Sequence, residues 1–518
     1  MATKAVRLAA IALASSCMLL VGIAAAIAEE FKTPAISAVR VEWSAALDQL
    51  RSELNIEPAV ASAFTFSGQR RFAASDPRSR PALVQLNALT SQFFTGIARS
   101  PVPVLLPFDT AAFTVDLLDA GSAGYNAVFS MLPGDGDPQR IFAKPVEVQI
   151  TGSILLYDIN DPVGGKGEPV KSLAAQYPDL RRFIREGYVR YAFTRFGVPY
   201  VVSIQCLDSV PDPRRLACRE AYPVAERFVR ALRIAGGLPS KPRIDIPSAL
   251  TDRPGGRSAD FTYRPSGEII VNSGFRKQDG HADSTVYSQI RFPLEKAPAF
   301  AHSQSFRNSR SADKPLDDLT GGNAGYPWQD NFCESRSFSV GQCANGFGHQ
   351  GQDIRPAPCL QSDGAERCDP KRQAVVAVRD GVIIRSAKQQ AATLQINTRT
   401  EHIRFRYMHM NPSALDASGV LNGRSVEEGE RIGVVSNYLD HPNGTSRHLH
   451  FDVQVFTRDG WLWVNPYVTL ISAYERLIGG RGREIGPETS PLPAVAHALP
   501  QDILRTDPQP LPRLYPGP

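Results

Sequence analysis

Short runs of β-branched and aromatic residues dominate the sequence from Tyr326 to Ile478, and they constrain the fold more than any other feature. Val, Ile, Phe and Tyr favour extended backbone, and turn residues separate the runs. The pattern predicts a β-rich domain of short strands and turns over residues 326–478. The runs are AVVAVRDGVII, ATLQINT, HIRFRYMHM, RIGVVS and HLHFDVQVF.

The rest of the chain divides by pattern into further parts. A chain of 518 residues is too long for one hydrophobic core, so two or three domains are expected. Mixed helical and extended patterns predict an α+β domain over residues 35–240, followed by a β-rich connecting region over 241–325. Residues 479–518 are proline-rich and are expected to form an extended tail. The expected helices are VEWSAALDQLRSEL (Trp43, Leu47, Leu50 and Leu54 on one face) and AERFVRALRI (Phe228, Val229, Leu232 and Ile234), and the expected strands include VEVQITGSILLYDI and VPYVVSIQCL.

The first 28 residues read as a secretory signal peptide. Lys4 and Arg7 precede an apolar run that ends in the small-residue pattern AIA. Export to the periplasm or cell envelope is the expected consequence. The apolar run of 21 residues, from Leu8 to Ala28, also has the length to span a bilayer, so an uncleaved membrane anchor is the alternative. The net charge of +5 comes without a concentrated basic tract, which argues against nucleic acid as a partner.

Six cysteines follow the signal segment, and an even number in an exported chain predicts disulfide bonds. No C-x-x-C spacing occurs, so a zinc ribbon is the weaker interpretation. Pairing by nearness in the sequence is one of the several possible connectivities. It gives Cys206 with Cys218, Cys333 with Cys343, and Cys359 with Cys368.

The histidines are strongly asymmetric in their distribution, because all nine lie after residue 280. In SRHLHFDVQV, His448 and His450 are two residues apart in a strand pattern, so alternation points both imidazoles to the same face. In GFGHQGQDIRP, His349 and Asp353 also share a face of an extended segment. The flanking glycines and Pro356 oppose a helix there.

These residue types are those of a catalytic zinc site. Such a site uses three imidazole or carboxylate ligands and leaves a fourth position open, whereas structural zinc sites are usually closed and rich in sulfur. His349 and Asp353 with either His448 or His450 supply three ligands of this kind. Magnesium and calcium prefer oxygen ligands alone, so the set favours zinc. Each pattern is weak by itself, but RYMHM adds His409 in a further expected strand.

Together these motifs resemble the lysostaphin-like zinc metallopeptidases, which cut the peptide cross-bridges of bacterial cell walls. The resemblance covers about 150 residues, from near Trp328 to Tyr467, and leaves the amino-terminal half unexplained. It implies a mainly antiparallel β catalytic domain with an open groove, within a multi-domain α+β protein. It rests on HQGQD, RYMHM, VEEGERIGVVS, and HLHF followed by VNPY, in the family's order.

The resemblance also implies a role for each motif residue. His349, Asp353 and His450 correspond to the ligands of Zn²⁺, and His409 and His448 to the two histidines that handle the water and the developing oxyanion. Peptidoglycan peptide stems are the implied substrate. The chain departs from the family in a cysteine-bounded insertion after Asp353, in Ser436 where glycine is common, and in Asp452 where glutamate is usual.

The neighbouring residues have simpler expectations. Arg447 and Tyr407 flank the motif histidines and are expected to contact substrate, and Arg355 and Arg406 are weaker candidates for the same role. His441 is expected at the rim of the groove. The remaining histidines, His281, His302, His402 and His497, sit among polar neighbours and are expected to be solvated.

Two other functions compete with the peptidase. A catalytically silent regulator that binds the cell wall would share the fold, although retention of all five motif residues opposes it. A cupin-type metal protein also uses H-x-H on a strand but needs a glutamate a few residues later, where this chain offers only Asp452. The absence of H-E-x-x-H excludes the zinc peptidases that carry their ligands on a helix.

Overall fold

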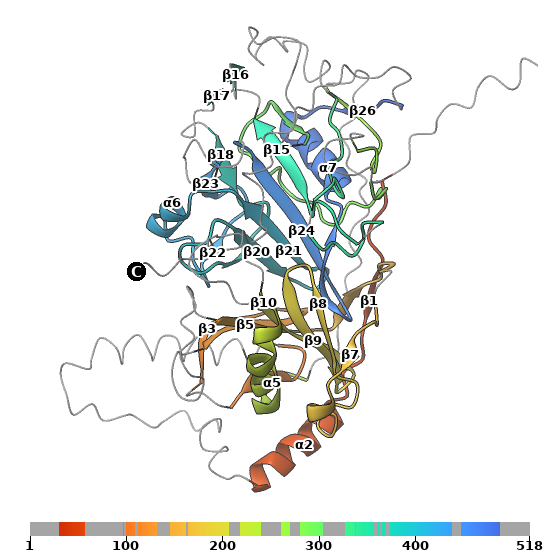
Figure 1. Ribbon diagram of the computed structural model, residues 1–518, viewed down its shortest axis with the longest axis vertical. Helices are drawn as coiled ribbons and strands as arrows, with labels where there is room; N and C mark the ends of the chain where they lie inside the picture. Colours follow the sequence, from red (N-terminus) through yellow and green to blue (C-terminus); the bar gives the residue numbers. More distant parts are fainter. Residues whose placement is uncertain are drawn as a thin grey trace, which may run out of the picture.

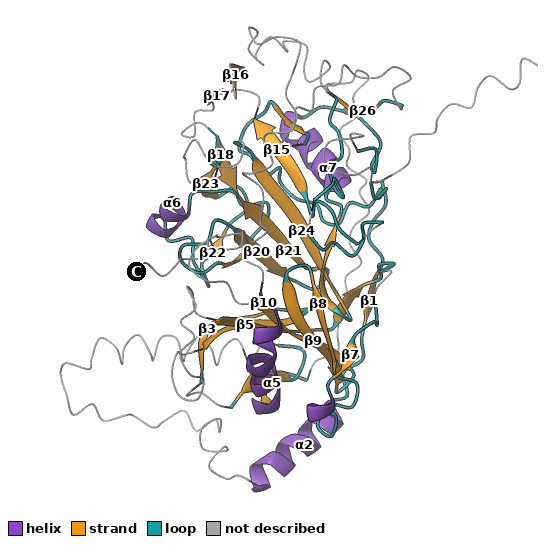
Figure 2. Cartoon of the chain, in the orientation of Figure 1, coloured by secondary structure: helices purple, strands orange, loops and turns teal. Residues whose placement is uncertain are grey.

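Strands outnumber helices throughout the described chain (Figure 2). Among the described residues, no helix is long and apolar enough to cross a membrane. The predicted signal segment, Cys359, Cys368, His441 and His497 lie outside the described residues. The computed structural model describes residues 31–56, 97, 100–108, 112–131, 146–161, 164–206, 218–239, 261–269, 280–303, 327–336, 338–344, 346–356, 360–362, 365–367, 373–437 and 447–486.

A seven-stranded antiparallel sheet, here called the N-terminal sheet, occupies the lower half of the molecule in Figure 1. Two-residue turns join β8 to β9 and β9 to β10, so these three strands form consecutive hairpins. The strands in spatial order are β3 (Phe113–Ala120), β4 (Gly124–Met131), β5 (Val146–Ser153), β10 (Val198–Gln205), β9 (Tyr188–Arg195), β8 (Arg181–Arg185) and β7 (Glu168–Pro169).

The helices α2 (Trp43–Ile56) and α5 (Tyr222–Ala231) belong to the N-terminal half, as predicted. Phe228 of α5 is fully buried and contacts the rings of Phe113 and Phe129, which fixes the helix on the apolar face of the sheet. The prediction for the end of this helix was wrong. Leu232 and Ile234 lie on β11 (Leu232–Gly236), which leaves the helix to pair with β2 (Val104–Pro107).

An eight-stranded antiparallel sheet, the C-terminal sheet, forms the upper half of the molecule (Figure 1). The path of paired strands is β13 (Ala299–Ala301), β15 (Gln352–Pro356), β24 (Leu449–Thr457), β21 (His402–Met408), β20 (Ala392–Asn397), β19 (Gly381–Ile384) and β22 (Ser425–Val426), with β25 (Gly460–Val464) also paired to β24. The expected strands of residues 326–478 are thus confirmed, and the sheet is antiparallel as the resemblance implied.

Small pairs and helices complete the fold. Two helices of the C-terminal half, α6 (Pro412–Ala417) and α7 (Tyr467–Ile478), were not predicted. The start of the proline-rich tail is a short strand that pairs in parallel with the connecting region. The remaining strands are β1 (Ile36–Ala38) with β6 (Leu155–Tyr157), β12 (Phe261–Tyr263) with β26 (Gly482–Glu484), β16 (Leu360–Ser362) with β17 (Ala365–Arg367), and β18 (Ala374–Val376) with β23 (Arg431–Val434). Short 3-10 helices cover Lys171–Leu173 and Cys218–Ala221.

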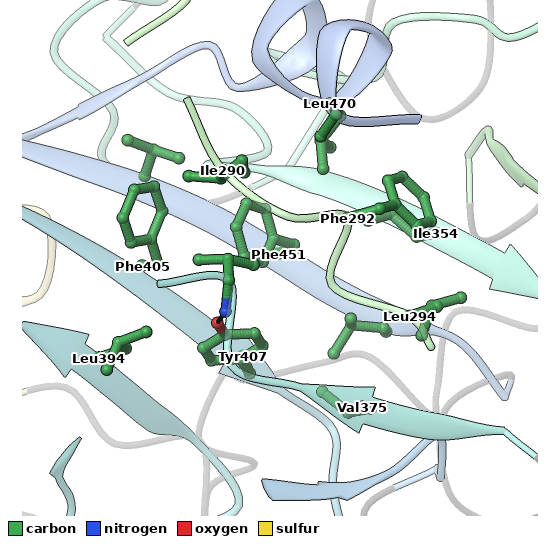
Figure 3. Close-up of a cluster of buried hydrophobic side chains, with 14 of the residues drawn as sticks. Ile290, Phe292, Leu294, Ile354, Val375, Leu394, Phe405, Tyr407, Phe451 and Leu470 are labelled. Atoms are coloured by element: carbon green, nitrogen blue, oxygen red, sulfur yellow. Dashed lines mark hydrogen bonds between the residues drawn. The ribbon is translucent and has the colours of Figure 1, made fainter. Parts of the chain in front are cut away.

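The main core of the C-terminal half lies on one face of its sheet, under α7 (Figure 3). Phe405 and Phe451 stack there with ring centroids 5.9 Å apart, and Ile290, Phe292 and Leu470 pack around them. Residues of the connecting region therefore contribute to this core. The opposite face of the sheet is polar along much of β21 and β24, and it is this face that carries the histidines.

The N-terminal sheet covers part of the polar face of the C-terminal sheet. Phe456 and Trp461 pack against Ala192 and Val201 of the N-terminal sheet. Arg404 is buried between the sheets, where its guanidinium lies 4.0 Å from the ring centroid of Trp461. It donates to three side-chain amides, those of Asn126 (2.6 Å), Gln149 (3.3 Å) and Gln395 (2.8 Å).

Two of the three expected disulfides are present, Cys206–Cys218 and Cys333–Cys343. The first lies beside the β8–β9 turn, because the backbone N–H of Cys206 donates to the carbonyl of Gly187 at 2.9 Å. The second closes a loop directly before β15. Pairing by nearness is confirmed for these four cysteines.

Candidate metal centre

Strand register brings the candidate ligands together from distant parts of the chain. On β15, Asp353 is the direct antiparallel partner of His450 on β24, and Met408 on β21 is the partner of His450 on the other side. His409 follows immediately after β21. Three adjacent strands thus deliver their polar side chains to one place on the sheet.

Alternation along β24 confirms the predicted geometry of the H-x-H motif. Leu449 and Phe451 are fully buried in the apolar core. His448, just before the strand, and His450 point to the other face, where the Nε2 atom of His448 and the Nδ1 atom of His450 both lie 3.2 Å from Oδ1 of Asp353. The backbone at His448 is held by a bridge to Ser436.

Three donor atoms converge with the spacing of a metal site. Nε2 of His349 lies 3.2 Å from Oδ1 of Asp353 and 2.9 Å from Nδ1 of His450, and the Asp353 to His450 distance is also 3.2 Å. Two ligand atoms about 2.0–2.2 Å from a tetrahedral metal ion are roughly 3.3–3.6 Å apart. The three distances here are slightly shorter, so the side chains would need to move apart only a little to bind the ion. This buried group of His349, Asp353 and His450 can hold a metal ion.

The hydrogen bonds of the outer ring nitrogens indicate which of the inner nitrogens carry lone pairs. Nδ1 of His349 lies 3.0 Å from the carbonyl oxygen of Asn331, which can only accept, so this nitrogen carries the proton. Nε2 of His450 lies 3.3 Å from Oδ2 of Asp452 and donates to that carboxylate. When His450 is neutral with its proton on Nε2, the two nitrogens that face each other both offer lone pairs. Two lone pairs and a carboxylate oxygen at this separation repel one another unless a proton or a metal ion lies between them.

Asp452 connects His450 to a buried ionic and aromatic network. Its Oδ2 also accepts from Nε of Arg406 at 2.7 Å, and its Oδ1 accepts from the indole Nε1–H of Trp463 at 3.0 Å. A carboxylate on the far nitrogen of a metal-binding histidine fixes both its tautomer and its ring orientation. No sequence pattern pointed to this contact, since Asp452 stood out as a departure from the pattern of the resembled family and not as a partner of His450.

His349 is held by the disulfide loop before β15. Its backbone N–H donates to the carbonyl of Glu334 at 2.8 Å, and its carbonyl accepts from the N–H of Cys333 at 2.9 Å. The Cys333–Cys343 bond closes this loop. Disulfide and ligand thus belong to one local structure.

His409 stands beside the ligand group but outside it. Its ring centroid lies 4.8 Å from that of His448 and 5.9 Å from that of His450. Nδ1 of His409 lies 3.0 Å from Oε1 of Gln390, an acceptor, which places the proton on Nδ1 and a lone pair on Nε2. Gln390 lies in the loop between β19 and β20, and no sequence pattern pointed to it.

The electrostatics of the group favour a positive charge among the ligands. Burial works to raise the pKa of Asp353, but the imidazoles of His349 and His448 outweigh it and hold this pKa well below its usual value. For His450 burial works to lower the pKa, yet the hydrogen bonds to Asp353 and Asp452 raise it overall. For His409 burial lowers the pKa well below its usual value, and the neighbouring His448 lowers it further.

Several of the other predicted positions need correction. Tyr407 is fully buried in the apolar core, where its hydroxyl accepts from the N–H of Val378 at 2.9 Å (Figure 3). It shares the inward face of β21 with Ile403 and Phe405, a position that does not fit a contact with substrate. Arg406 is paired with Asp452 instead of being open to substrate. Arg447 is partly buried next to His448, and its role in substrate binding stays a prediction.

Two histidines expected in solvent are buried. His302 is 3% exposed, and His402 is fully buried between the sheets. Nδ1 of His402 lies 2.8 Å from Oγ of Ser153, and its Nε2 accepts from the amide of Gln395 at 2.9 Å. Burial lowers the pKa of each ring to about 3, so both are neutral structural groups. For His402 the prediction was wrong because its polar neighbour Arg404 is buried between the two sheets instead of lying in solvent.

Part of the chain resembles a solved structure. No protein-family model matches the chain, and no curated protein matches it. Among solved structures, it is similar to a candidate glycyl-glycine endopeptidase, lytM, from Ruminococcus gnavus, with 21% sequence identity over 27% of this chain and 53% of that chain, and a TM-score of 0.19. The chain thus spans about half the length of that solved structure. The choice of a function therefore rests on the geometry of the metal centre.

Proposed function

We propose that the protein is an exported zinc metalloendopeptidase that hydrolyses the peptide cross-bridges of bacterial peptidoglycan. The observation that carries the proposal is the set of three inward-facing donor atoms, two imidazole nitrogens and one carboxylate oxygen, within 4.8 Å of one another. Nitrogen-rich sets of this kind suit zinc, and three protein ligands leave a position for reaction. The motifs that carry the family resemblance supply the substrate class.

His349, Asp353 and His450 would hold the zinc ion, which would supply the Lewis acidity needed to activate water and polarise an amide carbonyl near neutral pH. His409 accepts the proton from the attacking water at its Nε2 lone pair, since Gln390 holds the other nitrogen protonated. His448 donates a hydrogen bond to the developing oxyanion from Nε2, the nitrogen that faces Asp353. The strand pattern alone favours the opposite assignment, in which His448, on the same face as His450, takes the proton of the water and His409 donates to the oxyanion.

A catalytically silent regulator that binds the cell wall is the second candidate. The observation in its favour is the burial of the ligands, because His349, Asp353, His448 and His450 are each at most 4% exposed. An endopeptidase has to admit a peptide to such a centre. Partly exposed His409 marks the side from which a substrate would approach.

Hydrolysis of purified sacculi by the zinc-loaded full chain separates the two candidates. Mass spectrometry should find released fragments with new peptide amino termini, and not fragments cut in the glycan. His409→Ala should lose about a hundredfold or more in rate while it keeps bound zinc, whereas Asp353→Ala should lose the zinc. Wild-type protein that binds zinc but releases nothing supports the regulator. If both variants hydrolyse sacculi as well as wild type, the assignment of the site is wrong.

A further inference from the structure

Glu186, in the turn between β8 and β9, adopts a backbone conformation that is unfavourable for glutamate. Glu186 has φ of +54° and Gly187 has φ of +75°, the left-handed pair of a type I′ hairpin turn. Asn, Asp and Gly suit the first position of this turn, and glutamate does not. Glu186 is nevertheless only 2% exposed. A buried carboxylate kept in a disfavoured conformation points to a contact that needs it.

That contact leads to the metal centre. Oε1 of Glu186 accepts from the backbone N–H of Trp463 at 3.4 Å, and the indole of Trp463 donates to Asp452 at 3.0 Å. Asp452 in turn accepts from His450. Three consecutive hydrogen-bonded contacts therefore join a turn of the N-terminal sheet to a metal ligand of the C-terminal sheet.

The buried charges of this network are matched one to one. Oε2 of Glu186 accepts from Arg190 at 2.8 Å, and Oδ2 of Asp452 accepts from Arg406 at 2.7 Å. Glu186 thereby pairs with the guanidinium of Arg190, and Asp452 pairs with Arg406 and accepts from His450. Without the charge of Glu186, Arg190 would be a buried cation without its carboxylate, which is costly.

The residue before Glu186 reaches the other side of the centre. The guanidinium of Arg185 packs on Gly341, where an added Cβ would meet Nη2 at 1.7 Å, and it is oriented by Asp161 at 2.7 Å. Gly341 belongs to the disulfide loop that holds the backbone of His349. Arg185 and Glu186 thus contact the supports of two different ligands. In Figure 1 β8 lies next to the lower part of the C-terminal sheet, and the hydrogen bond from Trp463 to Glu186 joins the two sheets.

We propose that the β8–β9 turn is a positioning element of the metal centre, with Glu186 holding the Trp463–Asp452–His450 chain in the geometry that binds metal. This inference rests on the proposed zinc site and assigns a purpose to the N-terminal sheet that the sequence did not reveal. The sheet is then a part of the active structure.

Zinc binding by the full-length chain tests the inference without reference to hydrolysis. Glu186→Gln removes the charge, and Glu186→Asn also removes it but suits the backbone of the turn, which offsets part of the cost of leaving Arg190 without its carboxylate. Glu168→Gln is the matched control, because Glu168 is an exposed carboxylate of the same sheet that pairs with Arg182. For each protein the Zn²⁺ affinity is measured by competition with a chelator, the Co²⁺ absorption spectrum is recorded, and the melting temperature of the metal-free form is determined.

Both Glu186 variants should bind Zn²⁺ about three- to tenfold more weakly and shift the Co²⁺ spectrum, and Glu186→Asn should melt at a higher temperature than Glu186→Gln. The control should match wild type in all three measurements. Wild-type affinity and spectrum in Glu186→Asn would overturn the inference, as would an equal loss in Glu168→Gln. If the wild-type chain itself fails to bind Zn²⁺, the proposed function falls first and the inference with it.

Discussion

Among the residues that are not proposed as metal ligands, Asp452 should have the most direct effect on the metal centre. Because it accepts from Nε2 of His450, Asp452→Asn should free the ring to rotate or change tautomer and weaken Zn²⁺ binding by roughly 10- to 100-fold. Chelator competition measures the change. Asp459→Asn is the matched control, since this buried aspartate lies in the β24–β25 turn and pairs with Arg181, away from the ligands. Equal affinity in the two variants would contradict the role of Asp452.

Gln390 sets the protonation of His409, and a charge at this position should change it in a known direction. In wild type, burial lowers the pKa of His409, so the acid limb of the rate profile is expected below the usual value for histidine. Gln390→Glu places a carboxylate on Nδ1 and raises that pKa, so the acid limb of kcat should move to higher pH. Gln389→Glu adds the same charge one residue away and should leave the limb in place. An unmoved limb in Gln390→Glu would remove His409 from the base role.

The element that carries Asp353 depends on one close approach to β24. A Cβ added to Gly351 would lie 2.5 Å from the carbonyl oxygen of Phe451 and 2.9 Å from Nε2 of His450. Gly351→Ala should therefore push β15 away from β24 and reduce zinc affinity by about tenfold or more, while Gly486→Ala, where nothing lies within 4 Å, should have no effect. Isothermal titration with Zn²⁺ measures both. Tight binding by Gly351→Ala would show that the strands tolerate separation.

At the scale of elements, the sequence predicts the strands well and the irregular positions poorly. Alternation on β24 gives the shared face of His448 and His450. The same rule applied to β21 would place His409 beside Tyr407 in the core, but the φ of His409 is +67°, and this left-handed residue turns the side chain toward the other histidines. A positive φ at a residue other than glycine leaves no mark in the periodicity.

The sequence pattern missed helix α7 because the burial of this helix is unusual. The twelve-residue helix α7 is buried on almost all sides, from Tyr467 to Glu475, so it has no polar face from which a helical period could be recognised. Its neighbour in the sequence, the VNPY motif, has a structural purpose: Asn465 donates to the buried Asp330 at 2.6 Å. The motif therefore helps to identify the fold and takes no part in the proposed chemistry.

The whole molecule should respond to acid through the interface between its two sheets. His402 has a pKa of about 3 in the folded protein, through burial and the nearby charge of Arg404, against an ordinary value of 6.5. As the pH falls below 6.5, the unfolded chain takes up a proton that the folded chain refuses. The stability contributed by neutral His402 is thus fully present above that pH and is lost toward pH 3, by up to about 1.4 kcal/mol per pH unit.

Urea unfolding of the metal-free protein between pH 7.5 and 4.5 would measure how the free energy of unfolding changes with pH. In His402→Gln this slope should decrease by the equivalent of about one proton. Ser153→Ala removes the hydrogen-bond partner of His402 without removing a titrating group, and should keep the slope. His302→Gln should remove a similar share, because the pKa of His302 is also lowered to about 3 by burial. An unchanged slope in His402→Gln would mean that the sheets separate before the ring is protonated.

The pairing of Asp353 with His450 also bears on the order in which the protein assembles. These partners are 97 residues apart, whereas β8, β9 and β10 pair through two-residue turns. Local hairpins close with a smaller loss of chain entropy and form sooner than distant strand pairs. The hairpins would then be in place before the ligands meet and would serve as a template for them. Zinc added at the start of refolding should leave the early phase unaltered and accelerate only the last, a difference that stopped-flow tryptophan fluorescence would resolve.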